Sequence, residues 1–183
     1  MIVDQFFATS IGTGALSTLS YANRILALIL GMSAMAISRA TLPIFSEAQA
    51  KKSLEVNVLT AHWTTWMFGI GVLVGLGVWV ASPFIVKILF ERGAFSAQNA
   101  NDVARIMRYG LLQLPFYFAG IVCFSANSSN NKYALNGIAM IFAVIIKIAS
   151  NYFLVPVLGL TGIQIGTAIM YLSFMAVFLI RKE

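Results

Sequence analysis

The chain has 183 residues, of which 60% are hydrophobic and only 10% are charged. Soluble domains carry about a quarter of their residues as charges, so a water-soluble globule and a disordered tail are both excluded. The net charge is +6, but the basic residues are scattered between apolar runs, which argues against a nucleic-acid-binding surface. The composition therefore predicts an integral membrane protein whose basic residues report topology, lipid headgroups or an anionic substrate.

Several apolar stretches are long enough to cross a bilayer, which takes ~20 mostly apolar residues. They predict an all-α bundle of about five transmembrane helices in a single membrane domain, residues 1–183, with spans at about 15–44, 56–82, 97–126, 133–155 and 160–180. The third span is expected to be one helix longer than a bilayer, with Ser96 as its N-cap. Pro156 is expected to end the fourth helix, and Gly159 to let the chain reverse.

Two basic residues lie deep within these spans, Arg24 in the first and Lys147 near the middle of the fourth. A cation at a helix centre costs at least ~2.5–3.5 kcal/mol on insertion scales. The acidic residues, Asp4 included, fall at ends or in loops, so neither cation has an expected partner at its depth. Two unpaired cations indicate a wet cavity and a bound anion, with Asn23 and Asn151 as polar neighbours. The alternative is that Arg24 extends to the nearer membrane face and Lys147 pairs with a carboxylate outside this chain.

The other patterns indicate helix packing and no catalytic chemistry. Two GxxxG patterns, Gly71–Gly75 and Gly162–Gly166, allow helices to approach closely. The single cysteine, Cys123, has no partner for a disulfide or a metal site. No nucleophile–base motif or phosphate-binding loop is present, so we expect no catalytic residues, no metal and no cofactor. A membrane-embedded enzyme is therefore disfavoured.

Several short motifs occur in an order that resembles one known family. They are Tyr21-Ala22-Asn23-Arg24-Ile25, Ala40-Thr41-Leu42-Pro43, Leu89-Phe90-Glu91-Arg92-Gly93-Ala94-Phe95, Asn151 with Leu154 and Pro156, and Leu158-Gly159-Leu160-Thr161-Gly162. In this order they resemble the MurJ (MviN) family of lipid II flippases, which belongs to the MOP transporter superfamily. The third motif is similar to the family's RGxF signature, carried here by Arg92, Gly93 and Phe95. The resemblance covers almost the whole chain.

The resemblance implies a fold, a location and an activity. Full members have fourteen helices in two lobes around a cationic cavity, and this chain is similar to the end of the seventh helix through the twelfth, in the C-terminal lobe. It implies a multi-pass protein of the bacterial inner membrane that serves peptidoglycan biosynthesis, cell-wall organisation and cell shape. The substrate would be lipid II or a similar polyprenyl-diphosphate lipid, and the partners would be membrane lipids and a separate or missing N-terminal lobe. The side with Lys51 and Arg181 would be cytoplasmic.

Residue by residue, Arg24 matches a cavity arginine expected to contact the lipid diphosphate. Asn23 stands where many members have an acidic residue, and Lys147 stands where the family has an uncharged polar one. The expected diphosphate-binding residues are therefore Arg24, Asn23, Lys147 and Asn151, in a transporter that works by alternating access.

Two other functions stay open. The chain could serve a flippase for another polyprenyl-linked polysaccharide, although the Arg92-Gly93-Ala94-Phe95 motif argues against that cargo. Alternatively it is a non-transporting remnant or assembly module, because five helices without a second lobe cannot enclose an alternating-access path.

Overall fold

A computed structural model describes residues 2–12, 14–50, 56–90 and 97–180, and within these ranges the chain is helical and has no strand. The helices are α1 (Ile2–Thr9), α2 (Ala15–Ala50), α3 (Val56–Phe90), α4 (Ala97–Gly110), the 3₁₀ turn η1 (Leu111–Gln113), α5 (Leu114–Ser129), α6 (Tyr133–Leu158) and α7 (Leu160–Ile180). By length and composition, the described residues contain five helical stretches able to cross a membrane. The predicted all-α membrane fold is therefore confirmed.

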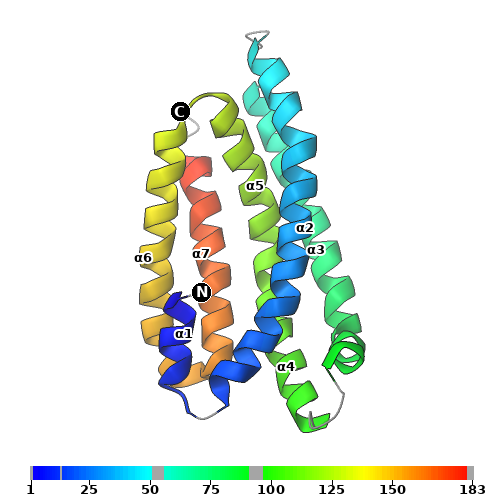
Figure 1. The fold of residues 1–183 in the computed structure, drawn as a ribbon. Coiled ribbons are helices and arrows are strands. Elements are labelled where there is room, and N and C mark those ends of the chain that lie inside the picture. The colour runs from blue at the N-terminus through cyan, green and yellow to red at the C-terminus, as the bar shows by residue number, and fades with distance from the viewer. Residues whose placement is uncertain (1, 13, 51–55, 91–96, 181–183) are drawn as a thin grey trace.

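The helices form two groups on either side of a central one (Figure 1). The run from α4 through η1 to α5 is the most buried of the spans and packs against α2, α3 and α7. α2 and α3 lie on one flank, and α6 and α7 form an antiparallel hairpin on the other. The short α1 contacts both α6 and α7, and its first residues lie part-way along the bundle rather than at its end. The first described residues of α1 therefore lie beside the middle of the bundle and not at its surface end.

Helix α3 continues beyond the predicted end of the second span and passes through a proline. The span was expected to stop at Ser82, but α3 runs through Pro83 to Phe90. Proline has no N–H and therefore leaves the carbonyl of Trp79 without its helical donor. The Ser82 hydroxyl donates to this carbonyl at 2.8 Å, and Nε of Arg108 donates to the Ser82 oxygen at 2.7 Å. A side chain thus replaces the missing backbone bond, as occurs in membrane helices.

The third span is not the single helix that was expected. α4 and α5 are separated by the 3₁₀ turn of Leu111–Gln113. Pro115 cannot donate to the carbonyl of Leu111, so the backbone N–H of Leu114 donates to it instead. The turn and the start of α5 lie close to α3: a Cβ added at Gly75 would lie 3.6 Å from the carbonyl oxygen of Leu111, and one added at Gly71 only 2.6 Å from Cα of Pro115. The proposed N-cap, Ser96, lies outside the described residues.

The reversal between α6 and α7 corrects another expected boundary. Pro156 lies inside α6, which continues to Leu158, so proline does not end this helix. Gly159 follows with φ of 59°, a left-handed conformation that favours glycine. Its N–H donates to the carbonyl of Val155 at 2.9 Å. The reversal therefore depends on the glycine, and the proline is accommodated in the last turn.

Candidate functional site

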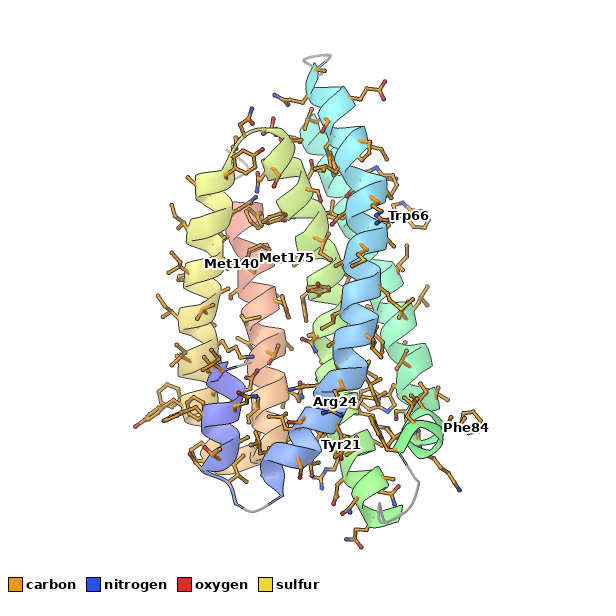
Figure 2. The ribbon with its side chains drawn as sticks, in the orientation of Figure 1. Tyr21, Arg24, Trp66, Phe84, Met140 and Met175 are labelled. Carbon is orange, nitrogen blue, oxygen red and sulfur yellow. The ribbon has the colours of Figure 1, made fainter. Side chains whose placement is uncertain are left out.

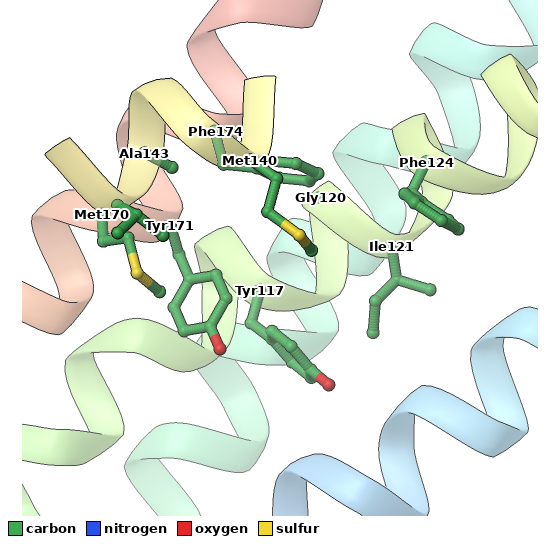
Figure 3. A pocket seen from close by; sticks show the side chains of 10 residues that line it. Tyr117, Gly120, Ile121, Phe124, Met140, Ala143, Met170, Tyr171 and Phe174 are labelled. Carbon is green, nitrogen blue, oxygen red and sulfur yellow. The ribbon is translucent and has the colours of Figure 1, made fainter. Parts of the chain in front are cut away.

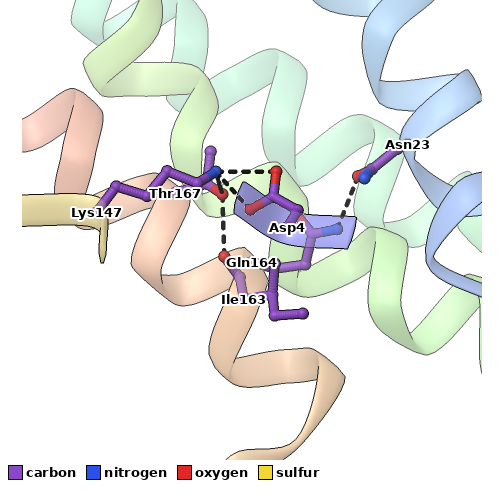
Figure 4. Close-up of polar contacts among 6 residues, drawn as sticks. All are labelled: Asp4, Asn23, Lys147, Ile163, Gln164 and Thr167. Atoms are coloured by element: carbon purple, nitrogen blue, oxygen red, sulfur yellow. Dashed lines mark hydrogen bonds and ion pairs between the residues drawn. The ribbon is translucent and has the colours of Figure 1, made fainter. Parts of the chain in front are cut away.

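A buried ion pair joins three helices at the centre of the α6–α7 hairpin (Figure 4). Nζ of Lys147 on α6 lies 2.8 Å from one carboxylate oxygen of Asp4 on α1 and 3.0 Å from the other. It also donates to Oγ1 of Thr167 on α7 at 2.8 Å. The hydroxyl of Thr167 in turn donates to the carbonyl of Ile163 at 2.9 Å. Both charged side chains are buried, each residue being 6% exposed.

This ion pair corrects the expectation that Lys147 has no acidic partner at its depth. The sequence places Asp4 near one end of the chain, which suggested a superficial position. In the structure α1 packs against α6 and α7, and its N-terminal residues lie part-way along the bundle. The carboxylate is therefore inside the protein, and it belongs to this chain rather than to another one. The charge of Lys147 is neutralised, so it no longer implies a bound anion.

A second polar contact connects α7 to α2. Nε2 of Gln164 donates to Oδ1 of Asn23 at 2.9 Å. Gln164 is 2% exposed, and a Cβ added at Gly110 would approach its side-chain oxygen to 3.0 Å. This glycine lies where α4 meets the 3₁₀ turn. Gln164 therefore links α2 and α7 by a partly buried hydrogen bond beside the α4–η1 junction.

These polar groups line one cavity that adjoins an apolar one. The polar cavity, of about 250 Å³, is lined by Asp4, Asn23, Gln113, Lys147, Gln164 and Thr167, together with Tyr171 and apolar side chains. The apolar cavity, of about 450 Å³, lies between α5, α6 and α7 (Figure 3). Both are lined by Val144, Met170 and Tyr171. The ring of Tyr171 packs edge-to-face on Tyr117, with centroids 4.9 Å apart.

Arg24 lies in a different environment although it follows Asn23 directly in the chain. Its side chain is exposed and does not line the polar cavity. Its guanidinium carbon lies 5.5 Å from the centre of the Tyr21 ring, and the two residues are neighbours on α2 in Figure 2. Within the described ranges Arg24 forms no ion pair and no hydrogen bond through its side chain. It is therefore a cation on an apolar helix that pairs with no acidic side chain among the described residues.

The remaining residues expected at the site do not join this cavity. Asn151 is completely buried and is absent from the cavity lining, and neither side-chain polar atom has a hydrogen-bond partner in the described part of the chain. Its side-chain oxygen occupies the space that a Cβ at Gly166 would need, so this face of the GxxxG pattern serves packing. Arg92, Gly93 and Phe95 lie outside the described residues. The structure thus brings together Asn23 and Lys147, but separates them from Arg24 and Asn151.

Four polar residues that line the cavity were missed from the sequence: Asp4, Gln113, Gln164 and Thr167. Asp4 interrupts the apolar stretch of Ile2–Thr9, which is an available signal for a paired charge if that stretch is taken as embedded. Gln164 and Thr167 are spaced three residues apart on α7, so they lie on one face of an uncharged helix. Within the described ranges no three His, Cys, Asp or Glu side chains are placed to hold a metal ion. The cavity therefore offers charged and hydrogen-bonding side chains that can bind a ligand.

Comparison with known proteins gives consistent results. The family model described as "Lipid II flippase MurJ" matches residues 1–183. The probable lipid II flippase MurJ of Helicobacter pylori strain J99 is 29% identical over 170 residues, which is 91% of this chain and 36% of that protein. The lipid II flippase MurJ of Thermosipho africanus is 30% identical over 151 residues, which is 82% of this chain and 30% of that protein. The chain thus spans about a third of the length of these curated relatives.

A solved structure shares the same fold. It is described as "Lipid II flippase MurJ, inward closed conformation", and it superposes with a TM-score of 0.85 at 21% identity. The superposition covers 98% of this chain and 38% of that one. The resemblance inferred from the motifs is therefore confirmed, including its restriction to part of the full-length proteins. On the match of the family model to all 183 residues, this chain belongs to the MurJ family of lipid II flippases.

Proposed function

We propose that this chain is the C-terminal-lobe portion of a flippase that moves lipid II, a polyprenyl-diphosphate-linked peptidoglycan precursor, across the inner membrane. As a member of the MurJ family it is an inner-membrane protein, with five described helices able to span. In this proposal the guanidinium of Arg24 binds the diphosphate. The activity and the substrate are proposed from the relatives, which are named as lipid II flippases.

The observation that carries the residue assignment is the contrast between Arg24 and Lys147. Lys147 is buried and neutralised by Asp4. Arg24 is exposed, and within the described residues no carboxylate pairs with it. A cation in an apolar span is unfavourable unless water or an anion solvates it. This favours Arg24 as the group that meets an anionic substrate, and it removes the unpaired charge that first suggested the same role for Lys147.

Arginine suits a diphosphate for geometric reasons. Its planar guanidinium presents five N–H donors in a fixed fork that can bind two phosphate oxygens at once. Asn23 would contribute only after giving up Gln164, because its side-chain oxygen already accepts that hydrogen bond. Arg24 is therefore the first contact, and Asn23 is a secondary polar group.

Transport itself requires a second lobe in this proposal. Alternating access moves one bundle against another around a binding site between them. Arg24 is exposed on α2, whereas the ion pair lies between α1, α6 and α7 in the interior of this bundle. The exposed arginine would face the path between lobes, and the neutral pair would hold this lobe together.

Complementation tests the proposal. The 183-residue chain is expressed alone, or together with the N-terminal lobe of a MurJ-family protein, in bacteria depleted of their own lipid II flippase. We expect growth only when both parts are present. In that background Arg24→Ala should abolish growth, whereas Arg105→Ala, which changes another exposed arginine, should be tolerated. Immunoblotting of the membrane fraction verifies equal insertion.

Each outcome decides between the possible functions. Failure to rescue despite verified insertion would overturn the flippase proposal and favour a non-transporting remnant. Rescue by the chain alone would support transport but contradict the need for a second lobe. Equal tolerance of Arg24→Ala and Arg105→Ala would remove Arg24 from the binding site. If the chain and the N-terminal lobe, reconstituted together in vesicles, move another polyprenyl-linked saccharide but not lipid II, the assignment of the cargo is wrong.

A further inference from the structure

The side chain of Arg24 lies over the ring of Tyr21, which itself packs on a second aromatic ring. Its guanidinium carbon lies 5.5 Å from the centre of the Tyr21 ring. The Tyr21 ring packs edge-to-face on Phe90 of α3, with centroids 4.9 Å apart and planes at 63°. Both rings are half-buried and pack against the main hydrophobic core. The exposed cation therefore rests on a ring that is itself fixed to a second helix.

This contact leaves the hydrogen-bonding edge of Arg24 available. An aromatic ring attracts a cation through the negative potential of its face and accepts none of the in-plane N–H bonds. A carboxylate partner would occupy the same donors that a phosphate needs. An aromatic support can thus restrict the rotamers of the arginine before the ligand arrives without competing with that ligand. Such restriction reduces the ordering cost of binding.

The contact also connects two sequence motifs. Tyr21 and Arg24 both belong to the Tyr21-Ala22-Asn23-Arg24-Ile25 stretch on α2. Phe90 is the last residue of α3 and belongs to the motif that continues to Phe95. The two motifs are far apart in the chain, yet these side chains touch. The end of α3 therefore contacts the aromatic ring over which Arg24 lies.

We infer that Tyr21, supported by Phe90, is a positioning residue that presents the guanidinium of Arg24 to the lipid diphosphate. This inference rests on the proposed function, because it assumes that Arg24 binds the anion. Tyr21 itself touches no phosphate in this arrangement. Its contribution to Arg24 is the π-face, so a variant that keeps the aromatic ring should keep this contact.

Binding of undecaprenyl diphosphate to the purified 183-residue chain in lipid nanodiscs tests the inference. Tyr21→Leu should weaken binding about 3- to 10-fold, because it removes the cation–π support. Tyr21→Phe keeps the ring and should stay within about two-fold of the wild type. Phe90→Leu should weaken binding in the same direction. Phe84→Leu is the matched control, since Phe84 lies on the same helix and is 68% exposed.

A double-mutant cycle separates positioning from general damage to the fold. In the Arg24→Ala background, Tyr21→Leu should cause no further loss, because the side chain that it positions is gone. Additive losses in the cycle would overturn the inference, and so would equal losses in Tyr21→Phe and Tyr21→Leu. If Tyr21→Leu does not fold, the comparison of Phe90→Leu with Phe84→Leu decides the question. If Arg24→Ala binds the lipid as well as the wild type, the proposed role of Arg24 fails first, which distinguishes the two failures.

Discussion

Lys147 and Arg24 are basic residues set in apolar helices, and the fold places them in opposite environments. Lys147 is 6% exposed, forms an ion pair with Asp4 and donates to Thr167. Arg24 is exposed and contacts the face of Tyr21, with no carboxylate partner in the described residues. One charge is thus compensated inside the chain, and the other remains available to a ligand.

The difference teaches that a charge inside a predicted span is an ambiguous signal. By hydropathy alone, placing either charged side chain within the membrane has a similar free-energy cost. Only the partner decides whether the charge stabilises the bundle or binds a substrate. A buried pair is also no proof of added stability, because its desolvation can cancel its attraction, whereas breaking one half of it is costly. The predictions below test whether the two cations really have separate roles.

The largest expected effect comes from breaking the ion pair. Lys147→Met should lower the free energy of unfolding by about 3–5 kcal/mol, because it leaves the Asp4 carboxylate buried without a partner. The double variant Lys147→Met/Asp4→Leu should recover most of that loss. Reversible denaturation by SDS in mixed micelles, followed by circular dichroism, measures both. If the double variant is as unstable as the single one, the pair does not act as a unit.

An intermediate loss of stability is expected from breaking the hydrogen bond between Gln164 on α7 and Asn23 on α2. Gln164→Met removes the donor to Asn23 and leaves its partly buried amide oxygen without that hydrogen bond, which should cost about 1–3 kcal/mol of unfolding free energy. Replacing both partners, as in Gln164→Met/Asn23→Leu, should cost less than Gln164→Met alone. The same SDS titration measures the unfolding free energy of both variants. A single-variant effect below measurement error would show that this hydrogen bond does not hold α7 to α2.

The smallest effect on stability is expected at Arg24. Arg24→Ala should change the free energy of unfolding by no more than about 0.5 kcal/mol, because the side chain is exposed and makes no ion pair within the described residues. In nanodiscs the same change should weaken undecaprenyl diphosphate binding by about 10-fold or more. A stability loss as large as that of Lys147→Met would contradict the comparison and make Arg24 a structural residue.

The secondary structure was predictable because long apolar runs in water-free surroundings must satisfy their backbone as helices. Helix ends were less predictable, since tertiary partners allowed α3 to continue through Pro83: the Ser82 hydroxyl satisfies the carbonyl that proline leaves free. The interruption at η1 could have been inferred from Pro115, but its position against Gly75 could not. Helix boundaries in a membrane bundle thus depend on neighbours as well as on local residue types.

The candidate site divides in the same way. Arg24 stood out because an arginine in an apolar helix is costly wherever the helix lies. The neutralisation of Lys147 could not be foreseen, because Asp4 and Lys147 come from opposite parts of the chain and meet only through the packing of α1 on α6 and α7. Asn151 was expected beside the ligand, but the close approach of Gly166 buries it between α6 and α7.

Hydrophobicity and its periodic interruption are properties of the chain alone, and they were enough to establish a helical membrane protein and, with its ordered motifs, its family. Charge compensation is a property of distances between side chains, which helix packing creates. Packing therefore settled which cation is paired with a carboxylate, which polar residues share a cavity, and which aromatic ring lies under Arg24. Electrostatic and hydrogen-bonding energies fall steeply with separation, so no reading of residue types can assign them before the helices are placed.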